Sequence, residues 1–140
     1  MNTKQKLDTL KRSDLFSKVP NSDLRALAES LRIERFKAGE KVCEHGAPAD
    51  RIYIVASGEL DARLPKAKSK VRTMGAGEII GEYGLFTGQV RSADVTCRKD
   101  SVLLSLEYGR FREFLDLFPG TTYALLEQTV HRLLAAQAST

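Results

Sequence analysis

The sequence has few of the residues that form metal centres, disulfide frameworks or catalytic triads. Its 140 residues include two cysteines and two histidines, and no tryptophan. Cys43 and Cys97 have no C-x-x-C or Cys/His spacing, so both are predicted to be free buried thiols. His45 and His131 lie on opposite sides of the central zone, whereas a metal-dependent enzyme usually needs clustered histidines. No G-x-S-x-G elbow occurs either. The composition therefore disfavours metal-dependent and serine-dependent catalysis.

Long hydrophobic runs are also missing. No stretch of about 18 or more apolar residues occurs, so no spanning helix is predicted. The first residues, MNTKQKLDTLKR, have no apolar run after their charges, and a signal peptide is not predicted. We therefore expect a cytoplasmic protein without a membrane segment. The formal net charge of +4 suits an anionic partner but does not select one.

The spacing of apolar residues divides the chain, predicted to be one domain of residues 1–140, into three zones. Residues 1–32 place leucines at helical spacing. Residues 33–106 carry short apolar runs separated by glycine-marked turns, a pattern typical of an all-β sandwich or barrel. Residues 107–137 return to helical spacing, with a break at Pro119–Gly120. The predicted fold is mainly β with flanking helices, specifically an eight-stranded jelly-roll β-barrel with N-terminal helices and two C-terminal helices.

One glycine-rich stretch, GEIIGEYGLFTGQVRSADV at residues 77–95, carries the most distinctive chemistry. Backbone N–H groups in a glycine-permitted turn, followed by one helical turn, form a concavity that favours an anion. Arg91 adds a planar, charged fork suited to phosphate oxygens, and Ser92 adds a hydroxyl. Glu82 would repel a phosphate unless it faces another part of the ligand, such as a sugar hydroxyl. The stretch predicts a ligand with one phosphate and one free hydroxyl; a surface ion pair around a glycine turn is the alternative.

The same stretch resembles the phosphate-binding cassette of the cyclic nucleotide-binding domain family. That cassette runs Gly-Glu-x-(Ala/Gly)-Leu, a short spacer, then Arg-(Ala/Thr/Ser)-Ala. Here residues 81–93 contain Gly81-Glu82-Tyr83-Gly84-Leu85 and Arg91-Ser92-Ala93. Gly84 stands where many members have alanine. The resemblance covers about residues 15–136, nearly the whole chain, and therefore implies the fold and ligand of that family.

The resemblance implies a regulatory sensor of cAMP or cGMP, with no enzymatic activity and no catalytic cofactor or metal. Glu82 would accept a hydrogen bond from the ribose 2′-hydroxyl, and Arg91 would pair with the exocyclic oxygens of the cyclic phosphate. Backbone N–H groups after Gly81, near Tyr83, Gly84 and Ser92, would complete the phosphate shell. Residues placed near the base are Ala62, Arg72, Met74 and Arg132. Arg72 and Arg132 have an open alternative as solvent-facing arginines, and the choice between cAMP and cGMP stays open.

The implied mode of action is repositioning of the C-terminal helices, with Gly109 and Pro119–Gly120 as hinges. The last helix also has more leucines than one face needs, so a homodimer or an effector domain on that helix is a further expectation. An alternative is a degenerate domain that serves for dimerisation or protein interaction. No helix-turn-helix follows residue 140, so we expect no direct DNA binding by this chain, which would be free-standing or cut from its output domain. A metal-dependent cupin-type enzyme is the alternative from another class.

Overall fold

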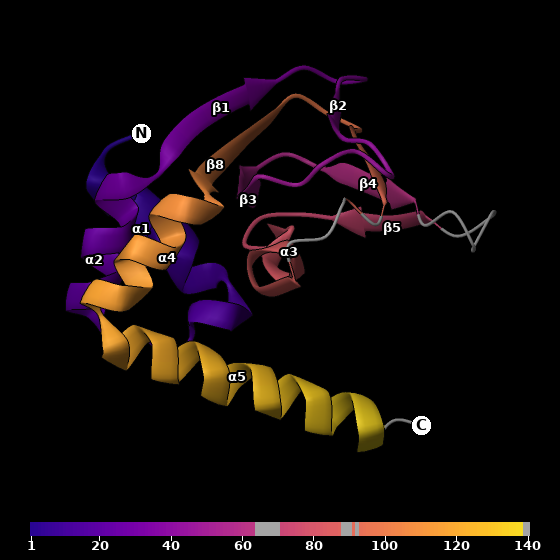
Figure 1. The fold of residues 1–140 in the computed structure, drawn as a ribbon. Helices are drawn as coiled ribbons and strands as arrows, with labels where there is room; N and C mark the ends of the chain where they lie inside the picture. Colours follow the sequence, from indigo (N-terminus) through magenta and orange to yellow (C-terminus); the bar gives the residue numbers. More distant parts are fainter. Residues whose placement is uncertain (64–70, 88–90, 92, 139–140) are drawn as a thin grey trace.

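The protein folds into two antiparallel sheets flanked by helices (Figure 1). The computed structural model describes residues 1–63, 71–87, 91 and 93–138. The first four-stranded sheet has the order β1 (Arg32–Phe36), β8 (Ser101–Glu107), β3 (Arg51–Ser57) and β6 (Ile79–Ile80). The second has the order β2 (Lys41–Cys43), β7 (Asp94–Cys97), β4 (Leu60–Arg63) and β5 (Val71–Met74).

Strands β3 and β8 lie at the centre of the first sheet and are apolar on both faces. On β3, Ile52 and Ile54 pack in one hydrophobic core, whereas Tyr53 and Val55 pack in another. Successive side chains of a strand point to opposite faces, so a strand between two cores needs an apolar residue at nearly every position. Strand β8 follows the same rule, which explains the runs RIYIVAS and SVLLSLE.

The two cores have different partners. The smaller core lies between the sheets and includes both cysteines, which are free and buried. The larger core lies between the first sheet and the helices, where the Phe16 and Phe111 rings stack with centroids 6.4 Å apart. These helices are α1 (Thr3–Arg12), the short 3-10 helix η1 (Asp14–Phe16), α2 (Asn21–Ser30) and α4 (Tyr108–Leu117). The helices thereby cover one face of one sheet.

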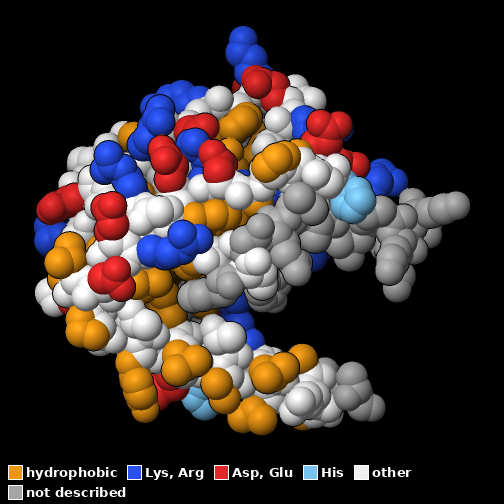
Figure 2. Space-filling model, in the orientation of Figure 1, with side chains coloured by type: hydrophobic (Ala, Val, Ile, Leu, Met, Phe, Trp, Pro, Cys, Tyr) orange, Lys and Arg blue, Asp and Glu red, His pale blue; other side chains and the backbone are white. Residues whose placement is uncertain are grey.

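The last helix, α5 (Pro119–Ala138), extends beyond this helical layer (Figure 1). Its first half contributes Ala124 and Leu125 to the larger core, and the Thr121 hydroxyl donates a 2.7 Å hydrogen bond to Asp23 of α2. Its second half packs on η1 and leaves several large apolar side chains exposed, visible as orange atoms along the helix in Figure 2. The helix is therefore anchored at its start and largely uncovered at its end.

The fold confirms the predicted mainly-β class with flanking helices. In the described part of the chain the strands pair into two separate sheets and form no closed barrel, and the eight-stranded jelly roll stays a prediction. Over the same residues, every helix is too short or too polar to cross a membrane.

Candidate functional site

The glycine-rich stretch forms the turn from β6 into the short helix α3 (Glu82–Thr87). Gly81 sits at the turn with φ +89°, a conformation that side-chain-bearing residues rarely adopt. A Cβ at this position would collide with Nη1 of Arg91 and lie 3.1 Å from the Tyr108 hydroxyl. Glycine is therefore required here both by the backbone and by the arginine that packs against it.

Arg91 is buried, with only 8% of its surface exposed. Its Nη2 donates a 2.8 Å hydrogen bond to the backbone carbonyl of Arg51, and Nη1 donates to the Tyr108 hydroxyl at 3.4 Å. Its guanidinium lies 5.7 Å from the centre of the Tyr53 ring. The backbone of Arg91 is also fixed, because its N–H donates to Ala47 and its carbonyl accepts from Gly46. The chain thus holds this guanidinium in one position behind the cassette turn.

The groups that directly contact the Arg91 guanidinium are neutral, and the Asp50 carboxylate acts on it only at longer range. Among the described residues, the ion pairs within 4.0 Å do not include Arg91. Burial raises the pKa of the Tyr108 phenol, so this hydroxyl stays protonated at neutral pH and donates 2.6 Å to the Gly81 carbonyl. A buried cation with no carboxylate in direct contact is unfavourable, and an anion entering beside it would offset that cost.

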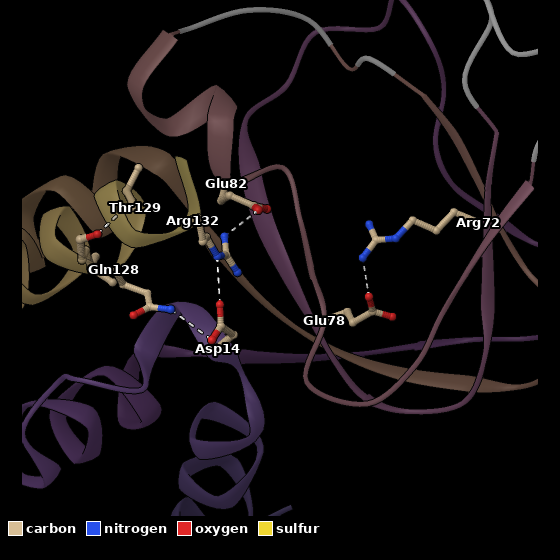
Figure 3. Close-up of polar contacts among 8 residues, drawn as sticks. Asp14, Arg72, Glu78, Glu82, Gln128, Thr129 and Arg132 are labelled. Atoms are coloured by element: carbon tan, nitrogen blue, oxygen red, sulfur yellow. Dashed lines mark hydrogen bonds and ion pairs between the residues drawn. The ribbon is translucent and has the colours of Figure 1, made fainter. Parts of the chain in front are cut away.

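Glu82 and Arg132 lie together, although they are 50 residues apart in the sequence (Figure 3). Nη1 of Arg132 is 3.5 Å from Oε1 of Glu82, and Nε of Arg132 donates to Oδ2 of Asp14 at 3.0 Å. The Arg132 hydrogen bond, with a further one from Gln128, holds the pKa of Asp14 below its usual value. Helix α3, helix α5 and η1 therefore meet at one charged cluster, formed by Glu82, Arg132 and Asp14.

A cavity of about 280 Å³ lies beside this cluster, between α3, α4, α5 and η1. Glu82 and Arg132 are its charged lining residues, and the other walls are mostly apolar: Leu15, Leu85, Phe111, Leu125, Thr129, Leu133 and Ala136. Figure 2 shows the hollow between α5 and the rest of the molecule. Because the cavity separates α5 from the cassette, the helix has room to approach it.

The remaining predicted residues are spread over other parts of the structure. Ala62 and Arg72 face each other across β4 and β5, and Met74 is buried between the sheets. Arg72 is exposed and forms an ion pair with Glu78, away from the Glu82 cluster (Figure 3). Tyr83 lies within α3, and Ser92 lies outside the described residues. The structure thus brings Gly81 to Arg91 and Glu82 to Arg132, but does not bring Arg72 to either pair.

Sequence reasoning missed three residues of this region: Tyr108, Arg51 and Asp14. Tyr108 fills the space beside Gly84, where a Cβ would lie 3.0 Å from its Cζ, so this chain has a specific reason for glycine at that position. Arg51 contributes through its backbone carbonyl, which no side-chain pattern reveals. Asp14 is one of many charged residues in its segment, and only the packing of η1 against α5 singles it out.

The chain belongs to the cyclic nucleotide-binding domain family, which residues 33–117 match. Its fold is similar to the solved N-terminal domain of a transcriptional regulator from Streptomyces coelicolor, with a TM-score of 0.82 and 27% identity over 95% of this chain and 94% of that one.

Curated relatives include regulators and channels. The chain is 28% identical over 129 residues to a CRP-like cAMP-activated global transcriptional regulator of Mycobacterium tuberculosis, covering 90% of this chain and 58% of the relative. It is also 28% identical over 125 residues to a cyclic nucleotide-gated potassium channel of Mesorhizobium japonicum, covering 89% and 34%. Across such relatives the chain spans only part of their length, from 21% to 58%.

The Tyr108 hydroxyl is expected to stabilise the turn at Gly81, and a substitution can test this. We expect Tyr108→Phe to lower the free energy of unfolding by about 1–3 kcal/mol, because the half-buried Gly81 carbonyl loses its donor. Tyr123→Phe is the matched control, since Tyr123 is 68% exposed, and its effect should stay within about 0.5 kcal/mol. Urea denaturation of both variants measures the difference, and equal stabilities would contradict the role given to Tyr108.

Proposed function

We propose that this domain is a regulatory sensor that binds cAMP or cGMP through its cassette and performs no catalysis. Arg91 pairs with the exocyclic oxygens of the cyclic phosphate, and Glu82 accepts a hydrogen bond from the ribose 2′-hydroxyl. The backbone after Gly81, at Tyr83, Gly84 and Ser92, supplies further N–H donors. The two sheets act as a jelly roll that encloses the ligand, with Ala62, Arg72 and Met74 on the strands nearest the base.

The observation that carries this proposal is the buried Arg91 guanidinium, whose direct hydrogen-bonding partners are neutral. A structural arginine at 8% exposure is normally paired with a carboxylate, because desolvating an isolated charge costs several kcal/mol. Here carbonyl and hydroxyl oxygens hold it instead, and the adjoining turn has glycine where a side chain would block access to its Nη1. This arrangement suits a ligand anion that completes the charge balance.

The relatives support the same ligand class. The Mycobacterium tuberculosis regulator is named for activation by cAMP, and the Mesorhizobium japonicum channel for gating by cyclic nucleotides. Both names describe those proteins, and we extend the ligand class to this chain because its motif residues match.

Calorimetric titration with cAMP and with cGMP tests the site. We expect wild type to bind at least one of them, and Arg91→Lys to weaken that binding at least about tenfold, because lysine keeps the charge but loses the two-pronged geometry. The nucleotide that binds more tightly shows which purine base, adenine or guanine, the site prefers.

Arg98→Lys is the matched control, because Arg98 is exposed and directly follows strand β7 of the second sheet. This substitution should leave the dissociation constant unchanged. A wild-type protein that binds neither nucleotide at millimolar concentration would overturn the proposal, and an unchanged affinity in Arg91→Lys would remove Arg91 from it.

We further propose that nucleotide binding repositions α5. The helix is anchored near Pro119–Gly120 and Thr121, its second half is largely exposed, and the 280 Å³ cavity separates it from the cassette. Arg132 on this helix already reaches Glu82, which places this part of α5 next to the cassette. A ligand shifts the helix only if it binds the two arrangements with different affinity, and contact between Arg132 and the base supplies that difference.

Amide hydrogen exchange with and without nucleotide tests this movement. We expect protection to increase in the cassette and in residues 125–138, while the centre of β3 stays constant because it is already buried. A change confined to the cassette would contradict helix repositioning while leaving nucleotide binding intact.

A second candidate function is dimerisation through α5. Tyr123, Leu126, Val130 and Leu133 are all at least 45% exposed and recur at spacings of three, four and three residues. This is the a/d spacing of a two-helix coiled coil, and a second copy of α5 is the partner that it fits.

Sedimentation velocity of wild type and Val130→Glu tests the dimer. We expect a concentration-dependent dimer for wild type and a monomer for Val130→Glu, because the substitution buries a charge in the seam. Ala135→Glu, exposed on the same helix but outside the repeat, should behave as wild type. A monomeric wild type would rule this interface out.

A further inference from the structure

Asp14 accepts hydrogen bonds from the last helix through both of its carboxylate oxygens (Figure 3). Oδ1 accepts a 3.0 Å hydrogen bond from Nε2 of Gln128, and Oδ2 accepts one of 3.0 Å from Nε of Arg132. Gln128 and Arg132 are four residues apart, so they lie one above the other on the same side of α5. One side chain of η1 therefore fixes both the position and the rotation of the exposed half of the helix.

The same contacts hold the Arg132 guanidinium beside the Glu82 carboxylate. Arg132 donates to Asp14 through Nε and approaches Oε1 of Glu82 to 3.5 Å through Nη1. Under the proposed function, however, Glu82 must accept the ribose hydroxyl and Arg132 must face the base. Arg132 therefore occupies part of the Glu82 carboxylate, and a ribose hydroxyl that binds there competes with this contact.

We propose that Asp14 is a positioning residue that lowers nucleotide affinity by holding α5 and Arg132 in the arrangement described above, with Arg132 beside Glu82. This inference rests on the proposed function of the cassette. A contact that must be given up when the nucleotide binds reduces the apparent affinity, because it lowers the population of the binding-competent arrangement. The N-terminal segment thereby sets the concentration of nucleotide to which the domain responds, without touching the nucleotide.

The other contacts of α5 with the N-terminal segments are less suited to this role. Thr121 bonds to Asp23 at the start of the helix, beside the Pro119–Gly120 break, where a swing of the helix moves the backbone least. Lys18 and Glu127 form an ion pair of 3.6 Å whose side chains are 45% and 42% exposed, so water screens it. Gln128, by contrast, is 8% exposed, so the donor of its bond to Asp14 is shielded even though the Asp14 side chain is 64% exposed.

Asp14→Asn tests the inference, because it keeps the shape of the side chain and removes its charge. In calorimetric titration with the nucleotide that wild type binds, we expect roughly threefold tighter binding, as appropriate to a partly exposed charged contact. In the Arg132→Ala background, the same substitution should change the dissociation constant by less than about 1.5-fold, because its main partner is absent. Gln128→Met, which removes only the bond to Oδ1, should tighten binding to a smaller extent.

The control is Glu59→Gln, which removes the carboxylate of the Glu59–Lys99 ion pair on the strand side of the molecule and should leave affinity unchanged. A merely structural role for Asp14 would lower the unfolding temperature of Asp14→Asn without tightening its binding. Unchanged or weaker binding in Asp14→Asn, with wild type binding normally, would overturn this inference alone. A wild type that binds no nucleotide would overturn the proposed function and this inference with it.

Discussion

The site depends on one constraint: the Arg91 guanidinium is buried with no carboxylate within 4.0 Å among the described residues. Its position is fixed by a backbone carbonyl, a tyrosine hydroxyl and an aromatic face, none of which neutralises its charge. Gly81 is required beside it because any side chain would occupy the same space. The burial that would make such an arginine costly in an ordinary core also makes it a strong attractor for an anion.

The fold supplies the rigidity behind this arginine. Strand β3 carries the Arg51 carbonyl that receives Nη2, and the same strand has its apolar residues in two separate cores. Tyr108 begins α4 directly after β8, and its backbone N–H donates to the Asp50 carbonyl just before β3. The groups that hold Arg91 are therefore attached to the most deeply buried strands, and the guanidinium does not have to be positioned by the ligand.

The last helix has the opposite character. Its start belongs to the larger core, but its end is held by a few polar contacts at η1 and the cassette, beside an apolar cavity. A rigidly held arginine beside a helix with few attachments is the combination that the proposed ligand-operated switch needs, because modest differential binding can move only a lightly held element. The two candidate functions of α5, movement and pairing with a second copy, both follow from its uncovered apolar side.

The sequence by itself determined the mainly-β class with flanking helices and the family. Strand and helix periods are local properties, and the cassette motif lies within thirteen consecutive positions, residues 81–93. The ligand roles of Glu82 and Arg91 remain predictions from that motif. Only the tertiary structure placed Tyr108 against Gly81 and Gly84, or Asp14 against Arg132, because these partners are separated by up to 118 residues and meet through packing of whole elements. A local pattern specifies which element a residue occupies, but the docking of one element on another decides which charge it meets.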